Sequence, residues 1–152
     1  MADSSGTGAA QEGIRCRVGK AEVALPVREV GQIIEYSVFP LPLARRWIGG
    51  IGLFEERPLL SIALARIPEK VRGTARPAKG ILLEAHSGGE VDWALEVDEL
   101  GSFLRATVTP RAAAAGIDLP SWISQARDEQ GRTIGWIDVG AMLSELTAVE
   151  PR

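Results

Sequence analysis

The sequence has one cysteine, one histidine and no long run of apolar residues. The single thiol, Cys16, cannot form an internal disulfide, which favours a reducing compartment. No apolar run approaches the roughly 20 residues that a membrane-spanning helix needs. The polar, slightly acidic start of the chain also differs from the basic and apolar regions of a signal peptide. We therefore expect a cytoplasmic protein with no direct membrane insertion.

Basic residues are few and scattered. The chain has 17 Lys and Arg residues against 20 Asp and Glu residues, for a net charge of -3. No Lys/Arg run is longer than two residues, whereas nucleic-acid-binding domains concentrate such residues in patches. Nucleic acid is therefore not an expected partner.

The sequence offers little that could support catalysis. His86 lies in the turn-like stretch "EAHSGGE", where a solvated residue without a function is expected. With no second histidine, and with Cys16 far away in the sequence, neither a zinc site nor a Cys-His pair is predicted. We expect a protein that is not an enzyme, with no catalytic residue, no metal site and no cofactor.

Paired acidic side chains are the other candidates for chemistry. Asp92, Glu96 and Asp98 alternate with the apolar residues of "VDWALEV" at positions 91–97. Because strand side chains alternate between two faces, the apolar residues are expected in the core and the acidic ones in solvent. The pattern therefore predicts the clearest strand of the chain and no catalytic carboxylate pair.

Most of the chain shows short apolar stretches of β character, broken by glycine and proline. Residues 14–18 and 23–27 form a predicted hairpin, and 142–146 has the spacing of an amphipathic helix. These patterns predict a disordered tail at 1–12 followed by a single domain over 13–150. Its predicted parts are a first barrel at about 13–66, a linker at 67–79, a second barrel at about 80–139 and a C-terminal helix at 140–149.

Two segments of the sequence repeat. "VALPVREV" (23–30) resembles "WALEVDEL" (93–100) at an offset of 70 residues. At an offset of 75, Trp47-Ile48 falls on Trp122-Ile123 and Arg57 on Arg132. Two repeats in the same order, at nearly the same offset, predict two similar β units. Units of about five short strands suggest a pair of small barrels, because closing a sheet removes its exposed edges.

The same segments carry a family resemblance. "VALPVREV", "LPLARRWIGGIGL", "WALEVDEL" and "PSWISQARDEQGRTIGWIDVGAML" resemble the CheW family of chemotaxis coupling proteins in order and spacing. The resemblance covers roughly residues 14–147. It implies a mainly β fold with two SH3-like five-stranded β-barrel subdomains packed together and a short C-terminal helix. It also implies a non-enzymatic adaptor between the cytoplasmic tips of chemoreceptors and a CheA-like histidine kinase, recruited to membrane-associated receptor arrays.

The resemblance further implies a protein-binding groove and recognition strand. In the family, a glutamate, here Glu29, lies near the arginine of an N-L-R-G motif. This sequence has "LFEE" in those slots, so Glu55 replaces the arginine. Arg57 shares a strand face with Glu55, and we hypothesise that it pairs with Glu29 or Glu55; the alternative is that all three lie in water. The predicted binding residues are Val27, Glu29, Val30, Leu53, Phe54, Glu55 and Arg57.

Several alternatives stay open. The departure from N-L-R-G is also compatible with a divergent module that binds a different protein, or a small ligand between its barrels. Phe54 is interpreted either as a core residue or as an aromatic anchor at an interface. The sequence does not determine the oligomeric state.

Overall fold

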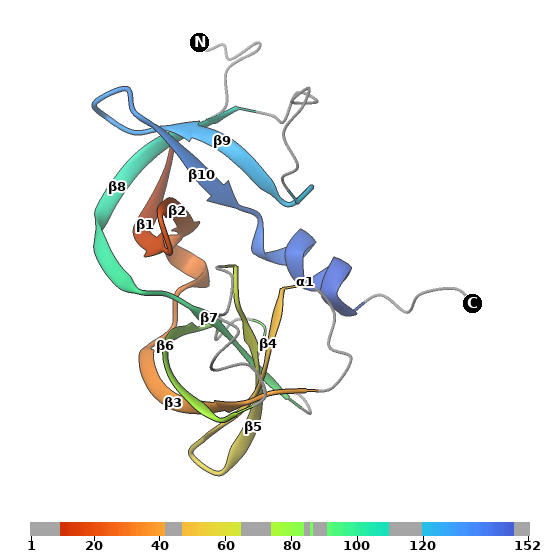
Figure 1. The fold of residues 1–152 in the computed structure, drawn as a ribbon. Helices are drawn as coiled ribbons and strands as arrows, with labels where there is room; N and C mark the ends of the chain where they lie inside the picture. The colour runs from red at the N-terminus through yellow and green to blue at the C-terminus, as the bar shows by residue number, and fades with distance from the viewer. Residues whose placement is uncertain are drawn as a thin grey trace. The chain divides into compact units, whose positions relative to one another are not determined.

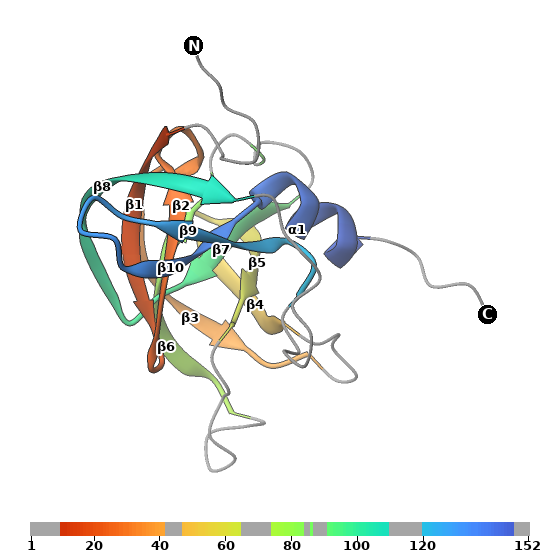
Figure 2. The ribbon, with the colours of Figure 1, turned by 90° about the horizontal axis from the view of Figure 1, so that it is seen from above.

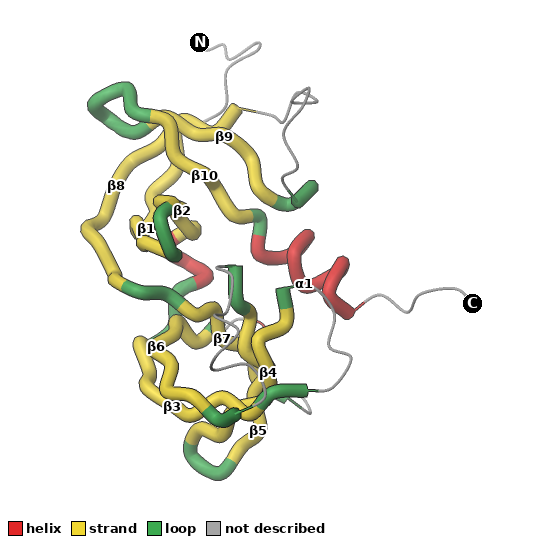
Figure 3. Tube along the Cα trace, in the orientation of Figure 1, coloured by secondary structure: helices red, strands yellow, loops and turns green. Residues whose placement is uncertain are grey.

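The computed structural model describes residues 10–41, 47–64, 74–83, 86, 91–109 and 120–147. Strands dominate these residues, as the yellow segments of Figure 3 show. The strands are β1 (Ala10–Val18), β2 (Ala21–Pro26), β3 (Ile33–Phe39), β4 (Ile48–Phe54), β5 (Arg57–Ile62), β6 (Arg76–Leu82), β7 (Asp92–Glu96), β8 (Glu99–Thr109), β9 (Ile123–Arg127) and β10 (Thr133–Ile137). A 3-10 helix, η1 (Val27–Glu29), follows β2, and the α-helix α1 (Val139–Thr147) follows β10.

The chain divides into two compact units, each with a closed five-stranded barrel (Figure 1). In unit 1 the strand order is β1-β2-β10-β9-β8, and in unit 2 it is β3-β4-β5-β7-β6. Figure 2 shows the five strands of unit 1 around one barrel, with the first two strands of the chain beside the last three. The predicted fold class, mainly β with two five-stranded barrels and a C-terminal helix, is confirmed.

The strand pairing corrects the predicted division of the chain into barrels at 13–66 and 80–139. Strands β1 and β2 close a barrel with β8, β9 and β10, whereas β6 and β7 close one with β3, β4 and β5. Residues 76–79 of the expected linker belong to β6, and 67–73 lie outside the described residues. The sequential division failed because apolar alternation marks a strand but does not identify its neighbour in a sheet.

The two sequence repeats mark equivalent strands. In unit 2, β5 pairs in parallel with β7 and places Leu60 opposite Trp93; in unit 1, β10 pairs in parallel with β2 and places Gly135 opposite Val23. Adding 75 to Leu60 gives Gly135, and adding 70 to Val23 gives Trp93. The two repeats therefore record one parallel pairing, made in the same register in both barrels.

Each barrel has its own apolar core. In β3 the residues alternate between exposed and buried along the whole strand, as a barrel wall requires. The core of unit 1 includes Ala24, Leu104, Ala106, Ala126, Ile134 and Trp136. The core of unit 2 includes Ile34, Tyr36, Val38, Leu59, Leu82 and Ala94.

The predicted hairpin around Gly19 is confirmed as β1 and β2, which are neighbours in unit 1. Cys16 lies on β1 and is 1% exposed. Burial raises the pKa of its thiol to about 12, because the thiolate would lose its hydration. Cys16 is therefore an unreactive core residue at neutral pH.

A network of polar side chains lies inside unit 2. The Ser61 hydroxyl donates to Glu96 Oε2 at 2.6 Å and lies 2.7 Å from the Tyr36 hydroxyl. Arg76 donates from Nη1 and Nη2 to the two oxygens of Glu96, at 2.7 and 2.8 Å. A Cβ at Gly49 would overlap both Glu96 and Arg76, so a residue without a side chain makes room for this pair. Burial raises the pKa of Tyr36 to about 12, which keeps the phenol protonated.

The prediction that Asp92, Glu96 and Asp98 face solvent is wrong for the two that lie on β7. Asp92 is 6% exposed, and the side chain of Glu96 is 14% exposed. Both faces of the strand are covered, because its central residues 93–95 are also buried. A buried carboxylate requires a cation or several donors, and arginines from neighbouring strands supply them. Asp98 is exposed, as expected.

The ends of the chain agree in part with the predictions. Residues 1–9 of the predicted tail lie outside the described residues, and residues 10–12 belong to β1. Helix α1 confirms the predicted amphipathic helix and buries Val139, Met142, Leu143 and Leu146. None of the described helices is long and apolar enough to cross a membrane.

We predict that Glu96→Ala lowers the free energy of unfolding by about 3 kcal/mol, because it leaves the guanidinium of Arg76, with a side chain only 16% exposed, without its carboxylate. Urea unfolding measures this loss. The matched control is Glu99→Ala, which breaks the exposed Arg17–Glu99 pair and is expected to cost far less. Equal losses in the two variants would contradict the structural role of the buried pair.

Candidate functional site

The predicted recognition residues lie mainly on the β4–β5 hairpin of unit 2. Strand β4 ends with Phe54 opposite Arg57, so Glu55 and Glu56 alone form the turn. Both glutamates have positive φ values, 52° and 64°. A two-residue hairpin turn with positive φ at both positions favours Asn and Gly. Local backbone preference therefore does not explain why two glutamates occupy this turn.

The outer face of β3, β4 and β5 carries exposed apolar side chains. Phe39 is 53% exposed and Leu53 is 59% exposed. Phe39 lies opposite Ile51, and Leu53 lies two residues beyond Ile51 and opposite Pro58. Paired residues, and residues two apart on a strand, share one side of a sheet. These four residues, Phe39, Ile51, Leu53 and Pro58, are called the apolar face below.

Phe54 has a different environment from its neighbour Leu53. It is half-buried and packs against the core of unit 2. Of the two interpretations of Phe54, the structure therefore places it with the core. Leu53, not Phe54, is the exposed apolar residue at this end of β4.

Arg57 forms a two-point ion pair with Asp92 of β7. Its Nε and Nη2 donate to the two carboxylate oxygens at 3.1 and 2.9 Å. The hypothesis from the sequence named Glu29 or Glu55 as the partner and did not include Asp92. Asp92 lies opposite Leu59 in the parallel β5–β7 pair, two residues from Arg57, so barrel closure creates this contact.

The side chain of Glu29 forms a hydrogen bond with that of His86. The two side chains meet at 2.8 Å between Oε1 and Nε2, with 13% of the Glu29 side chain and 30% of the His86 side chain exposed. The prediction that His86 is only a solvated turn residue is corrected. The two residues are 57 positions apart, so no local signal predicts the pair.

Backbone hydrogen bonds bring Glu29 and His86 together. The Gly31 N–H donates to the Leu82 carbonyl and the Leu82 N–H to the Gln32 carbonyl, which extends the β3–β6 ladder to the segment after Glu29. The His86 N–H then donates to the Leu83 carbonyl. The remaining predicted binding residues, Val27 and Val30, are both half-buried; Val27 is the last residue of its segment of unit 1.

The β9–β10 turn of unit 1 is the counterpart of the β4–β5 turn at the offset of 75. Asp128 occupies the position of Leu53, and its Oδ1 accepts hydrogen bonds from the N–H groups of Gln130 and Arg132, both at 2.9 Å. Gly131 occupies the position of Glu56 and has a φ of 80°. In this turn an aspartate side chain accepts hydrogen bonds from the backbone, and glycine occupies the position with positive φ. Both residue types are preferred in turns for these reasons.

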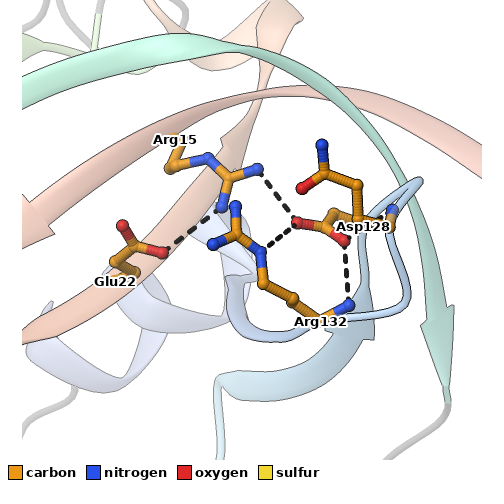
Figure 4. A network of polar contacts seen from close by, with 5 residues as sticks. Arg15, Glu22, Asp128 and Arg132 are labelled. Carbon is orange, nitrogen blue, oxygen red and sulfur yellow. Dashed lines mark hydrogen bonds and ion pairs between the residues drawn. The ribbon is translucent and has the colours of Figure 1, made fainter.

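Two arginines complete the environment of Asp128 (Figure 4). Arg15 Nη2 lies 3.1 Å and Arg132 Nε 3.4 Å from its Oδ2, and Arg15 also reaches Glu22 at 3.3 Å. The pKa of Asp128 is lowered to about 2, first by the backbone N–H of Arg132, with further hydrogen bonds from Arg15 and the Gln130 N–H. The carboxylate of Asp128 therefore stays charged over most of the acidic range.

Within the described stretches of the chain, no group of three or more His, Cys, Asp or Glu side chains is placed to hold a metal ion. In unit 1, an open depression is lined by Glu12, Phe103, Leu104, Arg105 and Glu129. Phe103 is 74% exposed there.

The architecture and the site define a mainly β, two-barrel domain with exposed apolar side chains on rigid strands. The family model of the CheW-like domain matches residues 12–147, so the chain belongs to the CheW family of chemotaxis scaffold and adaptor domains. The chain is similar to the scaffolding protein TtCheW from Thermoanaerobacter tengcongensis, with 14% identity, a TM-score of 0.59 and coverage of 86% of this chain and 90% of that chain. Among curated proteins, no match was found.

We predict that the Asp128 carboxylate makes stability depend on pH below about 4. Its pKa is about 2 in the folded chain against an ordinary value of 3.8, so its contribution is complete above pH 4 and is lost as the pH falls towards 2. Asp128→Asn keeps an oxygen acceptor for the turn but cannot titrate. Its urea midpoint should fall less steeply from pH 4 to pH 2 than that of the wild type.

Glu129→Gln, which removes an exposed carboxylate from the same turn, is the matched control and should follow the wild-type slope. Identical slopes for Asp128→Asn and the wild type would show that this carboxylate does not set the acid stability.

Proposed function

We propose that this chain is a non-enzymatic adaptor of a bacterial chemosensory complex, which couples the cytoplasmic tips of receptors to a CheA-like histidine kinase. Membership of the CheW family supports an adaptor role. The structural neighbour, named a scaffolding protein, is consistent with it. The observation that carries the proposal is the exposed apolar face, because contiguous exposed apolar side chains on a soluble domain mark surfaces for protein binding.

The strands hold the apolar face in one conformation. Phe39 and Leu53 lie on paired strands of a closed barrel, so little backbone entropy is lost when a partner covers them. Affinity would come from burying these two side chains, since aromatic and aliphatic anchors at the centre of an interface supply most of its binding energy. The charged residues beside them would set partner choice more than affinity.

Two further predicted binding residues, Glu29 and Arg57, have charged groups that other side chains hold in place. His86 holds the carboxylate of Glu29, and Asp92 holds the guanidinium of Arg57, whose side chain is still 48% exposed. Arg57 follows the β4–β5 turn directly, so its fixed charge would favour one orientation of a partner on the apolar face. Glu29 precedes β3, whereas Phe39 ends it, so Glu29 borders the opposite end of that strand. The adaptor would act in the cytoplasm, at the membrane-associated array that contains its receptors.

We predict that Phe39→Ser/Leu53→Ser weakens binding by at least about 10-fold, because it removes both exposed anchors of the apolar face. The measurement is biolayer interferometry with two immobilised probes from the same organism, the regulatory domain of a CheA-type kinase and a receptor tip. Phe103→Ser on β8 of unit 1, which removes an even more exposed aromatic residue, is the control and should bind as the wild type does.

Absence of binding of the wild-type protein to both probes would contradict the coupling role. An equal loss in the Phe103→Ser control would contradict the assignment of the binding surface to the apolar face.

A further inference from the structure

We propose that the β4–β5 turn and the apolar face together form a docking surface that selects a partner protein whose apolar patch is bordered by Lys or Arg. This inference rests on the proposed adaptor function and names the chemistry of the partner at the same site. It follows from the exposure of the apolar residues, from the charge beside them and from the composition of the turn.

The apolar residues and the acidic turn are adjacent. Leu53 is two positions before Glu55 on one side of the hairpin, and Pro58 is two positions after Glu56 on the other. Glu55 and Glu56 are both exposed, as are Leu53 and Pro58. A partner that covers Leu53 at this end of the hairpin would therefore place its own rim against two carboxylates.

Among the described residues at this end of unit 2, Arg57 and Arg76 already have carboxylate partners, which leaves the charge of the acidic turn. Arg57 is bound to Asp92, and Arg76 is bound to Glu96 inside the barrel. Within the described part of the chain, no ion pair is formed by Glu55 or Glu56. Two uncompensated carboxylates beside an apolar surface are complementary to a partner rim with basic residues.

The composition of the turn supports a role outside the barrel itself. The counterpart turn in unit 1 is longer, because its last strand pair is Arg127 opposite Thr133, and it has glycine, Gly131, at its position with positive φ. Glu55 and Glu56 close theirs with two residues that disfavour this conformation and that repel each other. Neither glutamate helps the hairpin to close. We therefore assign their negative charge to the binding of a partner protein that contacts the turn.

The acidic turn should make the association rate of the partner depend on salt. Charges at the rim of an interface mainly accelerate association, and salt screens them over a Debye length of about 8 Å at physiological ionic strength. Binding of the wild-type protein should therefore weaken as salt is added, chiefly through a slower association rate. Variants without the two carboxylates should lose most of this salt dependence.

Two double variants test the proposal. Glu55→Asn/Glu56→Gly removes both charges and introduces the dipeptide that this turn geometry favours, so the hairpin is retained or stabilised. Glu55→Lys/Glu56→Lys reverses the charge. The control, Glu99→Lys/Glu129→Lys, makes the same change in net charge at two exposed glutamates outside the docking surface. Thermal unfolding checks that every variant is folded.

The measurement is the affinity and association rate for the kinase regulatory domain and for the receptor tip, each at two ionic strengths. We expect the Asn-Gly variant to associate about 3-fold more slowly at low salt and the Lys-Lys variant to bind at least about 10-fold more weakly, while the control is unchanged. Wild-type binding that these two variants leave unchanged, or that Lys-Lys strengthens, would overturn the inference but not the adaptor function. A wild-type protein that binds neither probe would overturn both.

Discussion

The parallel strand pairs β5–β7 and β2–β10 are the constraint on which both barrels depend. Each pair joins a two-stranded segment to a three-stranded one and so closes a sheet that would otherwise expose two edges. Because the pairing register is the same in the two units, the alternation of side chains is also the same. Closure of unit 2 therefore directs Tyr36 inwards and leaves Phe39 and Leu53 on the outside.

Closure of the barrel in unit 2 also determines the ion-pair partners of its charged residues. Strand β7 brings Asp92 and Glu96 into the barrel, where they need cations, and Arg57 and Arg76 meet that need. Arg57, which the sequence suggested as a repair for the altered N-L-R-G segment, thus stabilises a buried carboxylate of β7. The departure from N-L-R-G changes the charge presented by the β4–β5 turn, while the hairpin still closes in register.

Local patterns predicted the features that depend on neighbours in sequence. The β1–β2 hairpin and helix α1 were predictable because side-chain periods of 2 and 3.6 act over a few residues. The equivalence of the repeats was predictable from the similar residues at offsets of 70 and 75. The alternation of β3 also indicates that Phe39 is exposed, since Phe39 shares a face with Ile33, Glu35 and Ser37.

Contacts across the barrels were not predictable in the same way. Arg57–Asp92 and Glu29–His86 join residues 35 and 57 positions apart. Their meeting depends on which strands are neighbours, and the sequence alone assigned β1, β2, β6 and β7 to the wrong barrels. The burial of Asp92 and Glu96 was missed because alternation assumes one solvated face, whereas β7 is covered on both.

Hydrogen exchange tests the central claim, that unit 2 offers a rigid apolar and acidic surface to a partner. Amides of Glu55 and Glu56, which form the exposed β4–β5 turn, should exchange quickly in the free chain. Addition of the kinase regulatory domain or the receptor tip should slow them, with no comparable change in the β9–β10 turn of unit 1. Unchanged exchange at Glu55 and Glu56, with protection confined to other segments, would contradict the account.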